Sequence, residues 1–134
     1  MDARGADRDC GRAGNVDSSR KAVRLCAAGT EAEFAGRRDD ARALYLQAWD
    51  GAVDDYERCV AAHYVAHLEP DPAEALRWNT TALAHARLAD QRLVADFLGS
   101  LYVNLGHSHE VTGNAVQAAT YYALAAEHGV VHRP

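Results

Sequence analysis

Apolar residues follow helical spacing along much of this chain. The segment HARLADQRLVADFL, residues 85–98, has apolar residues three and four positions apart and contains neither Gly nor Pro. Such spacing places the apolar side chains on one face of a helix. We therefore expect this segment to form helix rather than a loop, with the two helices that meet in it each extended by about one turn.

Helix-start signals divide the pattern into separate helices. Asp71 is followed by Pro72 and then by Glu74, an order typical of a helix N-terminus. Asn114 follows a glycine and suits the N-cap of the last helix, and Asp90 separates the fourth helix from the fifth. The chain therefore predicts six helices, at residues 19–35, 39–51, 53–68, 72–88, 91–112 and 115–127.

Small and aromatic residues recur at a fixed offset. Five residues of the last helical pair match residues of the same kind 77 positions earlier: Gly106, Gly113, Ala118, Tyr122 and Ala125 fall on Gly29, Gly36, Ala41, Tyr45 and Ala48. An offset of 34 from the earlier set gives a degenerate middle copy, which keeps Ala75 and Ala82 and has Pro70 at the turn. The matches indicate three repeated helical pairs. The alternative is a generic Ala-rich helical bundle.

A 34-residue unit of two helices with these residues resembles the tetratricopeptide repeat. The family has a Leu-Gly pair in its first helix, matched by Leu105 and Gly106, and the order Ala, aromatic, Ala in its second. Its closing proline is absent, and the residues there are Val53, Arg87 and Val130. The resemblance covers residues 20–130. It implies an all-α fold, an α-α superhelix of three antiparallel helical hairpins that forms a TPR-like right-handed solenoid.

The resemblance also implies a concave groove lined by the first helix of each hairpin. The side chains that it places there for partner binding are Glu33, Phe34, Tyr64, His67, Asn104, His107 and Glu110. This mixture of apolar, aromatic and hydrogen-bonding groups suits an extended peptide or an amphipathic helix. Because Glu33, Glu57 and Glu110 make the groove acidic and no Lys or Arg stands at the mapped positions, we expect a basic or neutral ligand rather than an acidic one.

Two groove histidines suggest a second interpretation. His67, His107 and Glu110 face the same groove in this mapping, and two imidazoles with a carboxylate suit zinc or acid–base chemistry. No HExxH motif and no Cys pair supports such a site. We therefore expect no metal, no cofactor and no catalytic residue, with His63 and His109 in packing roles. A small-ligand or metal site at the groove histidines remains the alternative.

The last helix is apolar on nearly all sides, since residues 115–127 contain one acid and no Lys or Arg. Such a helix is normally buried. We expect it to form a homodimer through Val116, Tyr121 and Leu124. The alternatives for this helix are a merely Ala-rich surface or one piece of a longer solenoid. A purely structural oligomerisation domain is an alternative for the function of the whole chain.

Composition limits the range of partners. The 134 residues carry a net charge of −5 and a single lysine, so a nucleic-acid partner is not expected. No apolar run approaches the ~20 residues of a membrane span. Residues 1–18 lack the apolar core of a signal peptide and predict a disordered leader, followed by the repeat domain at residues 19–130.

Cysteine usage and overall composition suggest where the chain acts. Three widely spaced cysteines without a CxxC pair indicate a reducing cytoplasm, with Cys26 and Cys59 in the core. The Ala- and Arg-rich, Lys-poor composition is typical of a high-GC bacterium. The sequence thus predicts a cytoplasmic protein- or peptide-binding module that acts as an adaptor or a regulatory sensor, and not as an enzyme.

Overall fold

The computed structural model describes residues 19–130, and this part of the chain is helical without a strand. The predicted leader, residues 1–18, and Cys10 within it lie outside the described residues. The elements in chain order are α1 (Lys21–Phe34), α2 (Arg38–Asp50), α3 (Asp55–Leu68), α4 (Pro72–Leu88), α5 (Gln91–Val94), a single 3-10 turn η2 (Ala95–Phe97), α6 (Leu98–Val111) and α7 (Ala115–Glu127).

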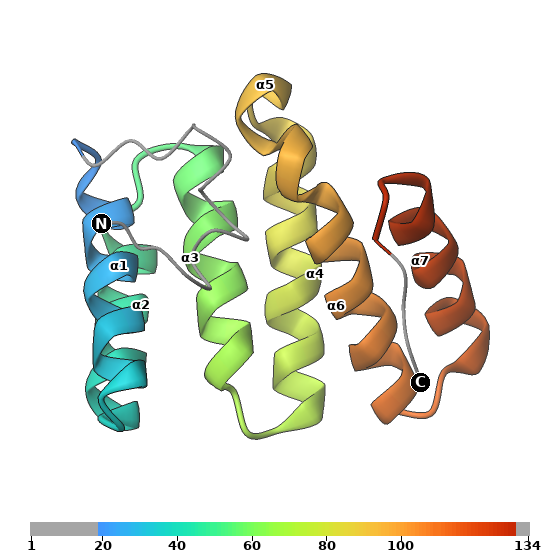
Figure 1. Ribbon diagram of the computed structural model, residues 1–134, viewed down its shortest axis with the longest axis horizontal. Helices are drawn as coiled ribbons and strands as arrows, with labels where there is room; N and C mark the ends of the chain where they lie inside the picture. The colour runs from blue at the N-terminus through green and yellow to red at the C-terminus, as the bar shows by residue number, and fades with distance from the viewer. Residues whose placement is uncertain (1–18, 131–134) are drawn as a thin grey trace.

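Three antiparallel hairpins stand side by side in one row (Figure 1). They are formed by α1 with α2, α3 with α4, and α6 with α7. Consecutive hairpins pack through α2 on α3 and through α4 on α6, and α1 also contacts α3. The predicted all-α array of three hairpins is confirmed.

Local signals place most of the helix starts. The side chain of Asn114 accepts a hydrogen bond from the backbone nitrogen of Gln117 at 3.1 Å, and that of Asp90 accepts one from Arg92. The predicted cap at Asn114 is confirmed, and Asp90, which was predicted to separate the fourth helix from the fifth, caps α5. Asp71 is the N-cap of α4 and is followed by Pro72, although its side chain makes no capping hydrogen bond.

Two glycines end the first helix of the outer hairpins in the same way. Gly36 and Gly113 have φ angles of +82° and +88°, a left-handed conformation that a side chain disfavours. They stand 77 positions apart, so the sequence repeat is also a repeat of turn geometry. In the middle hairpin the turn contains Pro70 instead.

The outer hairpins share one close contact, between a glycine and the ring of a tyrosine. In the first hairpin Gly29 lies against the ring of Tyr45, which is fully buried. In the third, a Cβ added at Gly106 would lie 2.6 Å from two ring atoms of Tyr122. A missing side chain therefore allows each pair of helices to approach closely.

The connection from α4 to α6 differs from the prediction. We expected one helix over residues 91–112, but the chain forms α5, then the turn η2, and only then α6. Val94 and Phe97 are both buried, and Phe97 packs edge-on against Tyr56. In a 3-10 turn residues three apart lie directly above one another, so this tighter winding turns both side chains to the core. The prediction of one uninterrupted helix is wrong, although the segment is helical rather than a loop. α5 projects beyond the row of hairpins (Figure 1).

The core extends through the first two hairpins to the start of α6. Cys26 and Cys59 are buried in it, as predicted, and neither forms a disulfide. Burial raises the pKa of the Cys59 thiol to about 12, so it is uncharged and unreactive at neutral pH. Among residues 19–130 no helix combines the length and the apolar character needed to cross a bilayer.

The glycine–tyrosine contacts generate the first prediction. Gly29→Ala should lower the free energy of unfolding by about 1–3 kcal/mol, because the added methyl group overlaps the ring of fully buried Tyr45. Gly106→Ala should cost less, because Tyr122 is only half-buried and can shift toward solvent. Urea denaturation measures both values.

Gly51→Ala is the matched control for these variants. Gly51 follows α2, has a φ of −98°, and an added Cβ would meet only one backbone oxygen at 3.4 Å. The free energy of unfolding of Gly51→Ala should be unchanged or slightly increased. A Gly29→Ala variant as stable as Gly51→Ala would contradict the packing argument.

Candidate partner-binding groove

A hollow of about 530 Å³ lies between the α3–α4 hairpin and α6. His67 enters it from α3, and Asn104 and His107 enter it from α6. Three of the seven predicted groove residues are thus brought together, from two different hairpins. Val103, Val111, Pro70 and Pro72 supply apolar surface beside them, so the hollow offers both kinds of contact.

Buried polar side chains hold the two hairpins together beneath this hollow. The Nδ2 atom of Asn79, on α4, donates to the Oγ of Ser108, on α6, at 2.9 Å. The Nδ2 of Asn104 lies 3.3 Å from the Nδ1 of His63, on α3. Sequence reasoning missed Asn79 and Ser108 as site residues. The available signal was Asn79 itself, which stands where the repeat pattern has an aromatic residue.

His63 is neutral at pH 7 in this setting. Burial, together with the neighbouring His67, lowers its pKa to about 4. With Nδ1 accepting from Asn104, the ring proton is on Nε2. The predicted packing role of His63 therefore includes a hydrogen bond that fixes the orientation of a groove residue.

Glu33 joins the first hairpin to the second. Its Oε1 accepts a hydrogen bond from the hydroxyl of Tyr45 at 2.9 Å, and its Oε2 lies 2.7 Å from the Nε2 of His67. Burial raises the pKa of Tyr45, so the hydroxyl stays protonated and donates. Both oxygens of Glu33 are engaged within the protein, which reduces the negative charge left for a ligand.

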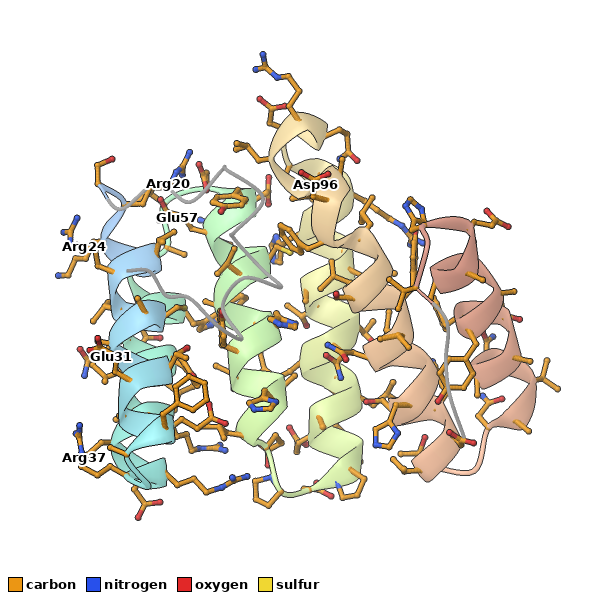
Figure 2. The ribbon with its side chains drawn as sticks, in the orientation of Figure 1. Arg20, Arg24, Glu31, Arg37, Glu57 and Asp96 are labelled. Atoms are coloured by element: carbon orange, nitrogen blue, oxygen red, sulfur yellow. The ribbon has the colours of Figure 1, made fainter. Side chains whose placement is uncertain are left out.

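Two expected features of the groove are wrong. Tyr64 was expected to be exposed, but only 7% of it is accessible, because its ring stacks on Tyr45 at a centroid distance of 4.9 Å. Glu57 was expected to add acidity, but it is buried. It accepts hydrogen bonds from Arg20 at 2.8 Å and from the backbone of Val53 at 3.1 Å. Figure 2 shows Arg20 and Glu57 close together at the end of the first hairpin.

The two remaining predicted residues are not part of the lining of the hollow. Phe34, the last residue of α1, is 73% exposed. Glu110 is exposed on α6 and accepts a hydrogen bond from the hydroxyl of Tyr122 at 2.7 Å. Neither lines the hollow beside His67 and His107. Within residues 19–130, no three His, Cys, Asp or Glu side chains gather in a way that could hold a metal ion.

The last helix, α7, packs chiefly on α6. Of the three residues expected in a self-association surface, Val116 is 77% exposed, whereas Tyr121 and Leu124 are half-buried. Tyr121 stacks on Tyr102 and on His109 of its own hairpin. Tyr121 therefore contributes first to internal packing, while Val116 is open to a partner.

A scan against protein-family models found no match to this chain. Searches of curated proteins and of solved structures also found none.

The depressed pKa of His63 generates a pH prediction. Above pH 6.5 the residue is neutral in both folded and unfolded chains. Between about pH 6.5 and 4 the unfolded chain binds a proton at His63 that the folded chain does not bind. The free energy of unfolding therefore decreases as the pH is lowered through this range, by about 1–3 kcal/mol in total. Urea denaturation at a series of pH values should show a shallower loss for His63→Gln.

His107→Gln is the control for this measurement, because His107 is exposed on α6 and has no hydrogen bond within residues 19–130. Its pH profile should match the wild type. If His63→Gln also follows the wild-type profile, then protonation of His63 does not limit stability in acid.

Proposed function

We propose that this chain is a TPR-like interaction module of the cytoplasm that binds a segment of another protein and acts as an adaptor or a regulatory sensor. The observation that carries the proposal is the hollow of about 530 Å³ in which His67, Asn104 and His107 meet from two hairpins. The repeat register at Gly29 and Gly106 supports the assignment to this class of repeat.

The chemistry of the hollow favours a basic or neutral peptide. Its lining includes no Lys or Arg to neutralise an acidic ligand. The side-chain oxygen of Asn104 and the ring of His107 offer hydrogen bonds, while Val103 and Val111 offer apolar contact. Hydrogen-bonding groups beside aliphatic side chains suit the alternating backbone and side-chain contacts of an extended peptide.

A peptide-display experiment tests this proposal. Peptides are selected from a random library on the wild-type chain, and their affinities are then measured for Val111→Trp and Val53→Trp. Val111 is 52% exposed and lines the hollow, so the larger ring should fill it and weaken binding about tenfold or more. Val53 is 74% exposed and lies outside the hollow, so its variant should bind like the wild type.

Two outcomes would contradict the proposal. One is that Val111→Trp binds the selected peptides as well as Val53→Trp does, which would remove the hollow as the site. The other is a selection dominated by Asp- and Glu-rich peptides, which would reverse the expected charge preference.

A second proposal is self-association through α7, and the exposure of Val116 favours it. Burial of apolar surface between two copies would stabilise a dimer. Light scattering should detect a dimer at micromolar concentration, and Val116→Glu should weaken it about tenfold or more, because a charge would be buried.

Val53→Glu is the matched control for self-association, because Val53 is 74% exposed and lies between α2 and α3. This variant should dimerise like the wild type. A wild-type chain that is monomeric at micromolar concentration would end the self-association proposal and leave the groove proposal standing.

A further inference from the structure

The two outer hairpins carry the same tyrosine–glutamate pair. In the first hairpin the hydroxyl of Tyr45 donates to Oε1 of Glu33 at 2.9 Å. In the third, Tyr122 donates to Oε1 of Glu110 at 2.7 Å. Both residues of the second pair stand 77 positions after those of the first, at the repeat offset. The third hairpin therefore reproduces the surface on which the first hairpin receives its neighbour.

The neighbour of the first pair is α3, which contributes two side chains. The ring of Tyr64 stacks on Tyr45 with an interplanar angle of 24°. Three residues later, the Nε2 of His67 lies 2.7 Å from Oε2 of Glu33. Residues three apart lie on one face of a helix, so α3 alone supplies both the ring that stacks on Tyr45 and the imidazole that contacts Glu33.

At the third hairpin the carboxylate retains an open acceptor. Glu110 is exposed, and its Oε2 has no hydrogen-bond partner within residues 19–130. Desolvation and the neighbouring Glu110 raise the pKa of Tyr122 to about 12, so this hydroxyl remains a donor and Oε1 remains occupied. The open oxygen corresponds to the one that binds His67 in the first hairpin.

We propose that the surface formed by Glu110 and Tyr122 docks a helix of another protein, in which an aromatic residue is followed three positions later by His, Lys or Arg. Its cationic or imidazole donor would bind Oε2 of Glu110, and its ring would pack against Tyr122, as His67 and Tyr64 do in the first hairpin.

The described chain cannot supply this helix from a second copy. Among the Phe, Trp and Tyr residues in the helices of residues 19–130, only Tyr64 is followed three positions later, in the same helix, by His, Lys or Arg. That tyrosine is already buried against Tyr45. The proposed occupant is therefore a different protein.

One position distinguishes the docking helix from α3. In the first hairpin Arg42 forms an ion pair with Glu69, the residue after α3, at 3.1 Å. The residue 77 positions after Arg42 is Ala119, which is exposed. The docking helix therefore needs the aromatic residue and the donor, but no acid at the place of Glu69.

The test uses a helix-stabilised synthetic peptide of residues 54–69 as the probe, added to the full chain labelled with ¹⁵N. Amide shifts should cluster on α6 and α7. Glu110→Gln should weaken binding at least about fivefold. A His67→Ala change in the peptide should weaken binding to the wild type similarly and add little to the effect of Glu110→Gln.

Glu127→Gln is the matched control, because Glu127 is exposed on α7 and takes no part in the tyrosine–glutamate pair. It should bind the peptide like the wild type. The proposal is overturned if the shifts lie on α1 and α2, where the peptide would replace α3, or if Glu110→Gln binds normally. Absence of any shift at about 1 mM peptide would also overturn it, since it excludes even weak affinity.

Discussion

The close contact between a glycine and a tyrosine ring is the constraint on which the hairpins depend. Gly29 and Gly106 each lie where an added methyl group would overlap the tyrosine of the partner helix. The missing Cβ brings the two helices together, and the ring fills the space beside them. The position of each tyrosine then determines the position of its hydroxyl, and the hydroxyl orients a glutamate on the first helix.

This packing unit also connects one hairpin to the next. Tyr45 receives the ring of Tyr64, and Glu33 receives His67, so the second hairpin is aligned by one stacking contact and one polar contact. His67 then stands at the edge of the hollow that we propose as the binding groove. The geometry of that groove therefore depends on packing in a different hairpin.

The middle hairpin lacks the glycine–tyrosine unit and replaces it with polar groups. His63 and Asn79 stand at the two positions, and both bond to side chains of α6. Buried polar groups need hydrogen-bond partners, so these two residues help to determine the position of the third hairpin relative to the second. The residues that replace the glycine and the tyrosine in the middle repeat thus form the hydrogen bonds at the base of the groove.

The sequence by itself determined the helices, their order and the register of the outer repeats, because helical spacing, caps and glycines act locally. It placed His67, Asn104 and His107 in one groove, and the structure brings these three together. Only the tertiary structure decided that Tyr64 and Glu57 are buried, that η2 interrupts the fifth helix, and that Glu33 is shared between Tyr45 and His67. Those outcomes depend on which side chains meet across hairpins, and spacing within one helix carries no information about that.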